Sequence, residues 1–120
     1  MSKRNERLYL TDILDLIIGI EAYIQNMTVD EFANDRKTYN ATIREFEIIG
    51  EAVKQLSDQS IEKYPHIQWR DIIDFRNLLI HEYFGVDLDM VWNIIIDDLP
   101  GLKSAVEELL DETDDRYLKQ

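Results

Sequence analysis

Apolar residues recur along most of the chain at the three- and four-residue spacing that places them on one face of an α-helix. Two long segments, residues 8–25 and 36–57, follow this spacing clearly. Their apolar stripes consist of Leu10, Ile13, Leu14, Ile17, Ile20 and Ile24 in the first segment, and of Ile43, Phe46, Ile49, Val53 and Leu56 in the second. The pattern predicts two amphipathic helices that bury these stripes in a shared core.

Polar residues with helix-capping character mark where several helices begin. Thr28 and Glu31 have the Thr-x-x-Glu spacing of a capping box, in which each side chain accepts a hydrogen bond from the backbone N–H of the other residue. This spacing predicts a short helix over residues 29–34. Asp35 is expected to cap the long helix that follows, and Asp87 a later one, because a side-chain oxygen at this position satisfies free N–H groups of the first turn.

A connector with one turn around Ile61 is expected over residues 57–65. The next helix should begin near Gln68 and end at Gly85, a residue type that commonly terminates helices. Its apolar positions are Trp69, Ile72, Ile73, Leu79 and Ile80. The pattern therefore predicts a fourth helix, after the short helix and the two long ones.

The last part of the chain has two apolar segments separated by a proline. Pro100 cannot donate the helical hydrogen bond, so the helix after Asp87 should break or kink near residues 98–99. A final helix is expected over residues 100–111. The tail from Glu112 onward is expected to fray.

Together these elements predict an all-α fold, an antiparallel bundle of about five helices that forms a single domain over residues 1–120. Gly50 lies beside an apolar stripe, where a missing side chain would let another helix approach closely. Some helices also carry apolar residues outside one stripe, such as Ile18 and Ile96. A homodimer would cover them; a wide stripe buried within a monomer is the alternative.

The amino-acid composition excludes several classes of protein and of active site. Hydrophobic residues make up 45% and charged residues 32% of the chain, which is typical of a globular protein and not of a disordered one. The absence of cysteine excludes disulfides, cysteine-ligated zinc, iron–sulfur clusters and thiol nucleophiles. The longest apolar run, residues 16–20, is far shorter than the roughly 20 residues of a membrane-spanning helix. We therefore expect a cytoplasmic protein that does not contact a membrane.

The formal net charge of −12 argues against nonspecific binding to DNA or other nucleic acid, since phosphate contacts require clustered Lys and Arg. The charge is uneven, however. Residues 97–115 contain eight acids and a single base, Lys103. The sequence is therefore compatible with a local basic cleft elsewhere in the chain.

Polar residues interrupt the apolar pattern of the predicted helix that contains Arg76, Asn77 and His81. Arg76 falls in line with apolar positions such as Ile72 and Ile80, and a permanent cation there is costly unless it has a partner or faces an interface. His81 lies about 140° around and 7.5 Å along the axis from Arg76, so the two would flank a cleft. Two such helices related by a twofold axis would bring two Arg and two His together.

These groups suit RNA cleavage by the neighbouring 2′-hydroxyl. Imidazole both accepts and returns a proton near neutral pH, a guanidinium stabilises the phosphorane, and Asn77 orients the substrate. The substrate supplies the nucleophile, so no metal or cofactor is needed. The spacing leaves a structural alternative open, in which Arg76 pairs with Asp71, Asp74 or an interface carboxylate, and His81 interacts with the helix dipole.

Several separated segments, in the same order, resemble the HepT toxins of the HEPN superfamily of metal-independent ribonucleases. Arg76-x4-His81-x-Tyr83 resembles the R-x4-H-x-Y signature of that family. The other matching segments are Ile43-Arg44-x4-Ile49-Gly50-Glu51-Ala52, Tyr64-Pro65-x3-Trp69-Arg70-x-Ile72, Tyr83-Phe84-Gly85-Val86-Asp87, Val91-Trp92 and Asp98-Leu99-Pro100. The resemblance covers roughly residues 8–110.

The resemblance implies a dimeric HEPN-like bundle in which both motif helices line one cleft. It implies that Arg76 and His81 are catalytic, and that Asn77 matches the polar residue commonly found after the arginine. It also implies a toxin whose partner antitoxin is an MntA-type minimal nucleotidyltransferase, which transfers AMP to Tyr83. AMP groups at the cleft mouth would repel RNA.

Two questions of function stay open at the level of sequence. The chain is expected to be a toxin ribonuclease. The alternative is a noncatalytic module that binds a nucleotidyltransferase. A third possibility, a nucleotide-binding bundle, has no Gly-rich phosphate loop in the sequence to support it. The basic residues that would bind RNA beside Arg76 are also open. The candidates are Arg36, Lys37, Arg44 and Arg70, each of which a solvated helix face would equally explain.

Overall fold

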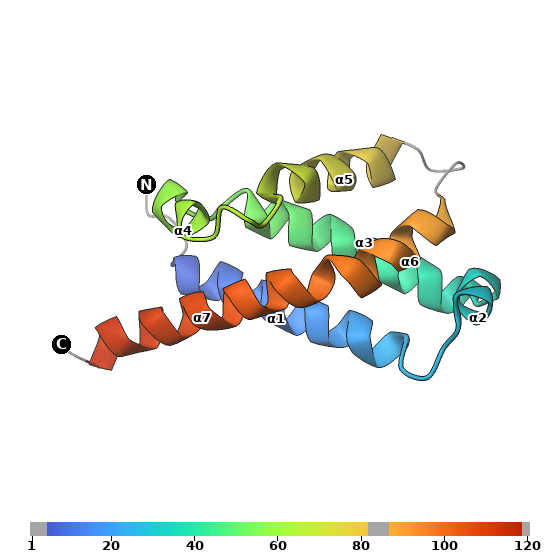
Figure 1. Cartoon of the computed structure of the whole chain (residues 1–120), viewed down its shortest axis with the longest axis horizontal. Coiled ribbons are helices and arrows are strands. Elements are labelled where there is room, and N and C mark those ends of the chain that lie inside the picture. Colours follow the sequence, from blue (N-terminus) through green and yellow to red (C-terminus); the bar gives the residue numbers. More distant parts are fainter. Residues whose placement is uncertain (1–4, 82–86, 119–120) are drawn as a thin grey trace.

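The computed structural model describes the backbone of residues 5–81 and 87–118, and the side chains of residues 5–78 and 87–112. Within this part the chain is helical and contains no strand. The helices are α1 (Glu6–Tyr23), α2 (Val29–Asn34), α3 (Arg36–Val53), α4 (Asp58–Glu62), α5 (Trp69–His81), α6 (Leu88–Asp97) and α7 (Leu99–Leu118) (Figure 1). None of these described helices combines the length and apolar character needed to cross a bilayer.

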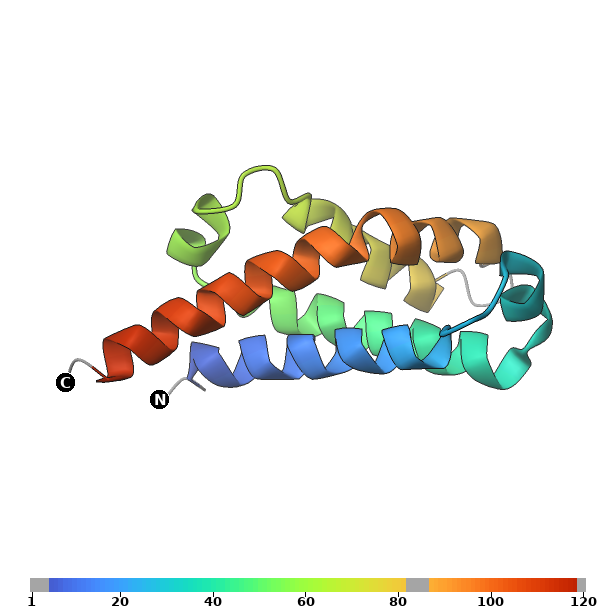
Figure 2. The ribbon, with the colours of Figure 1, turned by 60° about the horizontal axis from the view of Figure 1, so that its bottom comes forward.

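The five longer helices form an antiparallel bundle, as the sequence predicts (Figure 1). Helices α1 and α3 run in opposite directions side by side, and α7 packs against α1 (Figure 2). Helix α5 packs extensively only against α3 among the described helices. The short α2 contacts α3 and α6 and closes one end of the bundle.

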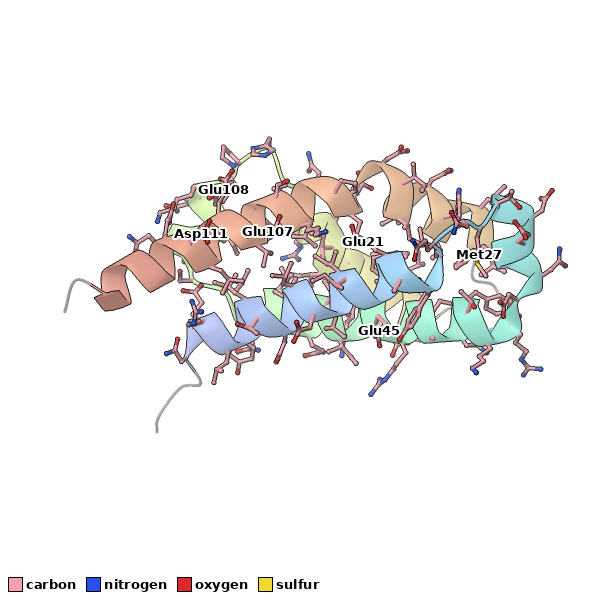
Figure 3. The ribbon with its side chains drawn as sticks, turned by 90° about the horizontal axis from the view of Figure 1, so that it is seen from below. Glu21, Met27, Glu45, Glu107, Glu108 and Asp111 are labelled. Carbon is pink, nitrogen blue, oxygen red and sulfur yellow. The ribbon has the colours of Figure 1, made fainter. Side chains whose placement is uncertain are left out.

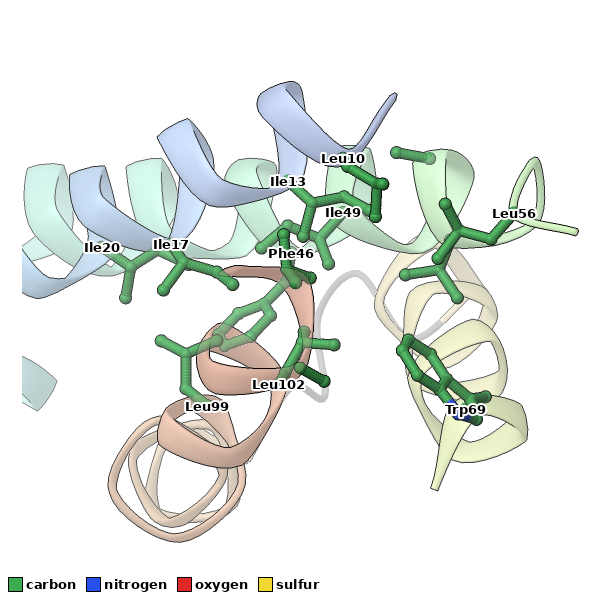
Figure 4. Close-up of a cluster of buried hydrophobic side chains, with 14 of the residues drawn as sticks. Leu10, Ile13, Ile17, Ile20, Phe46, Ile49, Leu56, Trp69, Leu99 and Leu102 are labelled. Atoms are coloured by element: carbon green, nitrogen blue, oxygen red, sulfur yellow. The ribbon is translucent and has the colours of Figure 1, made fainter. Parts of the chain in front are cut away.

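The predicted apolar stripes form the core. Helix α1 contributes four fully buried residues, Leu10, Ile13, Ile17 and Ile20. Helix α3 contributes Ile49 and Val53, which are fully buried, and Phe46, which is nearly so. Phe46 lies between the α1–α3 layer and the start of α7, where Leu99 and Leu102 approach it (Figure 4). Ile18 and Ile96, which lie outside the stripes, are 47% and 51% exposed in the protomer.

The predicted helix caps are confirmed. Thr28 Oγ1 accepts from the Glu31 N–H at 3.2 Å, and Glu31 Oε1 accepts from the Thr28 N–H at 2.9 Å. Asp35 accepts from the N–H of Thr38 at 3.1 Å, and Asp87 caps α6. Hydrogen bonds from both the side chain and the backbone of Thr38 lower the pKa of Asp35.

Pro100 separates two helices as predicted. Helix α6 ends at Asp97, and α7 begins at Leu99. Pro100 therefore occupies the first turn of α7, where its missing N–H breaks no helical hydrogen bond and its fixed φ suits the helix. The bend redirects the chain so that the rest of α7 crosses α1 (Figure 2).

Three predicted boundaries are wrong. Helix α1 spans Glu6–Tyr23 and not residues 8–25, because Asn5 caps it by accepting from the Arg7 N–H. Helix α3 ends at Val53 and not at residue 57, because Ser57 instead caps α4.

The third error is the expected fraying from Glu112. Helix α7 continues to Leu118, and Glu112 forms an ion pair with Lys63 at 2.6 Å that joins α7 to the end of α4. The predicted helix stop at Gly85 lies outside the described residues.

Gly50 permits the close contact between α3 and α5, as its position beside the stripe predicts. A Cβ added at this position would overlap Cβ of Arg76, would lie 2.9 Å from its Cγ, and would lie 3.5 Å from the backbone oxygen of Ile72. These atoms belong to the backbone or to the base of a side chain, so they cannot move aside without shifting the helix. The spacing of the two helices therefore depends on the missing side chain.

We expect Gly50→Ala to lower the free energy of unfolding by about 1–3 kcal/mol, because overpacking outweighs the gain in helix propensity. Urea unfolding followed by circular dichroism measures this difference. Gly19→Ala is the matched control, since its Cβ would lie 3.4 Å from a Glu45 oxygen, an ordinary contact. The control should be neutral or stabilising by up to about 1 kcal/mol. Equal effects of the two substitutions would contradict the close-contact explanation.

Candidate active site

Helix α5 is anchored at its start by a buried hydrogen bond. Trp69 Nε1 donates to the backbone oxygen of Tyr64 at 3.0 Å, and the Trp69 side chain is 6% exposed. Along the helix, Phe75 packs edge-on against Phe46 of α3 with ring centroids 5.3 Å apart. These contacts fix the rotation of α5 and therefore the direction in which Arg76 projects.

Arg76 lies where α5 crosses Gly50 of α3. Its Cβ and Cγ pack over the glycine, and its guanidinium Nη2 forms an ion pair with Glu51 Oε1. Nη1 donates to Asn77 Oδ1 at 2.9 Å. The Arg76 side chain is 24% exposed, so it is partly accessible to solvent.

Glu51 is the carboxylate partner of Arg76, and sequence reasoning missed that role. Asp71 and Asp74 were the local candidates, but Asp74 lies 3.6 Å from Arg70 in an exposed ion pair. Glu51 follows Gly50 in the sequence. A residue next to a glycine at which two helices cross lies close to the side chains of the second helix. That adjacency was the available signal, although it becomes informative only once the crossing partner is known.

Arg76 Nε is buried and has no hydrogen-bond partner among the described residues. A buried donor without an acceptor is destabilising, by roughly 1–3 kcal/mol, and more when the group is charged. The rest of the side chain is partly exposed, and guanidinium N–H groups form charge-assisted bonds to phosphate and carboxylate oxygens. The donor arrangement around Arg76 therefore suits an anionic ligand.

The remaining predicted site residues are only partly within the described structure. His81 is the last residue of α5, about 7.5 Å along the axis from Arg76 in a regular helix, and its side chain lies outside the described residues. Tyr83 lies outside them entirely. The structure thus brings Arg76 and Asn77 together, and leaves the predicted pairing with His81 and Tyr83 as an expectation.

Two of the four basic candidates for RNA binding are paired with acids at the surface. Arg44 contacts Glu47 at 3.2 Å on α3, and Arg70 contacts Asp74 on α5. Arg36 and Lys37 are exposed at the start of α3. Arg44 and Arg70 therefore fit a solvated helix face better than a dedicated phosphate site.

Acidic residues gather on the face of the bundle opposite α5. In the view of Figure 3, Glu21, Glu107, Glu108 and Asp111 lie on α1 and α7 in front of α5. Glu21 forms an ion pair with Lys103 at 2.9 Å. Burial and the neighbouring Glu108 raise the pKa of Tyr64 to about 12. Several acids therefore lie on a different side of the bundle from α5, whereas Asp71 and Asp74 lie on α5 itself.

Within residues whose side chains are described, no three His, Asp or Glu approach one another closely enough to hold a metal ion. The described residues around Arg76 offer one carboxylate, Glu51, and one amide, Asn77. The N–H donors of this group are those of the Arg76 guanidinium and the Asn77 amide, the donor types that bind anions.

Comparison with known proteins identifies the family. Residues 13–109 match the family model described as "Ribonuclease HepT-like". The chain is 41% identical over 110 residues to "Putative RNase MJ0127" of Methanocaldococcus jannaschii, covering 92% of this chain and 91% of that protein. It is 40% identical to "Probable ribonuclease HepT" of Thermococcus cleftensis over 89% of this chain and 97% of the relative.

A further relative of Methanocaldococcus jannaschii is longer than this chain. It is "Gamma-glutamylcyclotransferase and putative RNase MJ0434", which is 39% identical to this chain. The match covers 93% of this chain and 50% of that protein. No solved structure matches significantly. The family match over most of the chain, together with the helical bundle and the motif helix α5, shows that this protein belongs to the HepT-like family.

Proposed function

We propose that this protein is the toxin of a HepT/MntA-type toxin–antitoxin system and a metal-independent endoribonuclease. The observation that carries this proposal is the state of Arg76, which is packed on Gly50, paired with Glu51 and left with an unpartnered buried Nε. Family membership and the RNase names of the relatives support the reaction class.

In the proposed reaction, the RNA supplies its own nucleophile. His81 removes the proton of a 2′-hydroxyl, and the 2′-oxygen forms a bond to the adjacent phosphorus. The bond from phosphorus to the 5′-oxygen breaks, and an imidazolium returns a proton to that leaving oxygen. The products are a 2′,3′-cyclic phosphate and a 5′-hydroxyl, so no water, metal or external cofactor enters this step.

Arg76 is proposed to stabilise the negative charge that builds up on the phosphorane. Its terminal Nη groups would donate to nonbridging oxygens, while Glu51 holds the guanidinium in orientation. Asn77 adjoins this edge and is proposed to orient the scissile phosphate. Glu51 is thus a positioning residue, since it acts through Arg76.

The proposed site is completed by a second copy of the chain. Leu78, beside Asn77 on α5, is 41% exposed and is a large apolar residue next to the proposed cleft. In a regular helix Asn77 lies between Leu78 and Arg76, about 100° around from each, so a twofold axis near Asn77 would place both residues at the edges of the interface. We therefore propose a homodimer with the two α5 helices at its interface.

Regulation is proposed to act on Tyr83. An MntA-type nucleotidyltransferase would transfer AMP from a nucleoside triphosphate to the phenol oxygen, forming a phosphodiester to tyrosine and releasing pyrophosphate. Each AMP adds negative charge near the proposed cleft and would exclude RNA. This proposal rests on the position of Tyr83 in the motif that resembles the HepT signature.

We expect Arg76→Ala and His81→Ala each to reduce RNA cleavage by at least about 100-fold, because each removes a group that acts in the transition state. Cleavage of total cellular RNA by purified protein, with circular dichroism as the folding control, measures this loss. EDTA should have no effect, and an RNA with a 2′-O-methyl group at the cut site should be resistant. Undiminished cleavage by His81→Ala, or inhibition by EDTA, would reject the mechanism. Absence of cleavage by the unsubstituted chain would favour a noncatalytic partner-binding module.

A matched pair of substitutions tests the role of Glu51. Glu51→Gln should lower cleavage by about 10-fold through loss of Arg76 orientation. Asp74→Asn removes an exposed carboxylate of α5, the helix that carries Arg76, and should leave cleavage within about twofold, because exposed ion pairs contribute little. If both substitutions had the same effect, the positioning role would be excluded.

The dimer proposal predicts that Leu78→Asp produces a monomer with native circular dichroism and greatly reduced cleavage, since a carboxylate in an apolar interface is strongly disfavoured. Light scattering after size-exclusion chromatography measures the mass. Ile18→Asp is the control, because Ile18 is 47% exposed on α1. Dissociation of the dimer by Ile18→Asp but not by Leu78→Asp would place the interface on α1 and contradict the proposed interface between the two α5 helices.

AMP transfer predicts a mass increase on coexpression with an active MntA-type transferase, and no increase for Tyr83→Phe. Intact-mass spectrometry measures each added AMP as about 329 Da, the mass of the nucleotide less water. The modified protein should have lost RNA cleavage. An unchanged mass with an active transferase would contradict the modification.

A further inference from the structure

A cavity of about 360 Å³ lies between α3, α5 and the junction of α6 with α7. Its inner surface includes the buried side chains of Phe46 and Leu102, and its walls include Ile67, Ile72 and Ile94, which are only partly buried. Because α5 packs extensively only against α3 among the described helices, its other flank leaves these apolar side chains open. The volume is large enough to receive one or two large side chains of another molecule.

The rim of the cavity is acidic. Asp71, Asp97 and Asp98 line it and are exposed, and none forms an ion pair with a described residue. The imidazole of His66 and the amide of Gln68 supply the rest of its polar lining. Neither Lys nor Arg contributes to the lining. An apolar cavity with this rim favours a ligand that combines a large apolar group with positive charge.

The cavity borders the flank of α5 that carries Phe75, and Asn77 is about 160° away from Phe75 around a regular helix. Ile72 also lines the cavity and is only about 40° from Arg76. An occupant of the cavity would therefore leave Asn77 uncovered and would lie closer to Arg76. The acidic rim also disfavours RNA, since phosphates would be repelled.

We propose that this cavity, defined by Phe46, Ile67, Ile72, Ile94 and Leu102 with its three-aspartate rim, docks a basic segment of a partner protein. The segment would insert a large apolar side chain between α5 and the α6–α7 junction, and place flanking Lys or Arg beside Asp71, Asp97 and Asp98. A second copy of this chain is a poorer occupant, because its net charge of −12 would meet an acidic rim. The proposal is independent of nuclease activity.

The test uses a peptide probe, Lys-Lys-Trp-Leu-Lys-Lys, with fluorescein at its C-terminus. Its anisotropy in titration with the full chain should give saturable binding with a Kd of about 0.1 mM or tighter, weakened by added salt. Two further peptides separate the contribution of the apolar side chains to binding from that of the positive charges. Replacing Trp-Leu by Ser-Ser, or every Lys by Glu, should each weaken binding by at least about 10-fold.

Variants of the chain locate the binding site. Asp97→Asn with Asp98→Asn should weaken binding by about 5–10-fold, whereas Glu107→Gln with Asp111→Asn, an equal charge change elsewhere on the chain, should change it less than about twofold. Gly101→Phe should abolish binding by filling the cavity. Gly101→Ala should not, since its Cβ would lie 3.7 Å from Ile67 Cδ1, an ordinary contact.

Three outcomes would overturn the proposal. No saturable binding at about 1 mM chain would exclude docking of this chemistry. Equal weakening by the two pairs of acid substitutions would show nonspecific attraction to an acidic protein. A change in oligomeric mass on Gly101→Phe would identify a second copy of the chain as the occupant. Because every readout is binding or mass, failure here leaves the nuclease proposal unaffected.

Discussion

The missing side chain at Gly50 determines how α5 lies on α3, and the rest of the site depends on that contact. Cβ and Cγ of Arg76 occupy the space that a Cβ at position 50 would take. The same crossing places the guanidinium beside Glu51, one residue further along α3. A glycine in the middle of a helix is destabilising by roughly 0.5–1 kcal/mol relative to alanine, and the close packing of α5 is the compensating gain.

The surroundings of Arg76 explain how a partly buried cation is accommodated on an apolar helix face. The aliphatic part of the side chain packs in the α3–α5 contact, while Glu51 and Asn77 bind the two terminal nitrogens. The buried, unpartnered Nε is a cost of this packing. The chain has a strongly negative total charge, and Asn77 and the partly exposed Arg76 still carry N–H donors for a phosphodiester.

Much of the fold could be predicted from the sequence, because its main determinants are local. The stripes of α1 and α3, the capping box at Thr28 and the break before Pro100 depend on residues within a few positions of one another. The errors have nonlocal causes. Helix α7 extends past Glu112 to Leu118, and the contact of Glu112 with Lys63 could not be read from either segment alone. Glu51 was missed as the partner of Arg76 for the same reason, since that contact exists only after α5 crosses Gly50.

The proposed reaction requires the guanidinium of Arg76 to bind an RNA phosphate. NMR of the chain labelled with ¹⁵N-arginine tests it most directly, using a 2′-O-methyl oligonucleotide of mixed sequence that cannot be cleaved, with Arg76→Lys to assign the Nε–Hε signal. The proposed contact predicts that this signal shifts on titration and saturates, while that of Arg70, paired with Asp74 at the surface, changes little. An unchanged Arg76 signal at saturating oligonucleotide would contradict the claim.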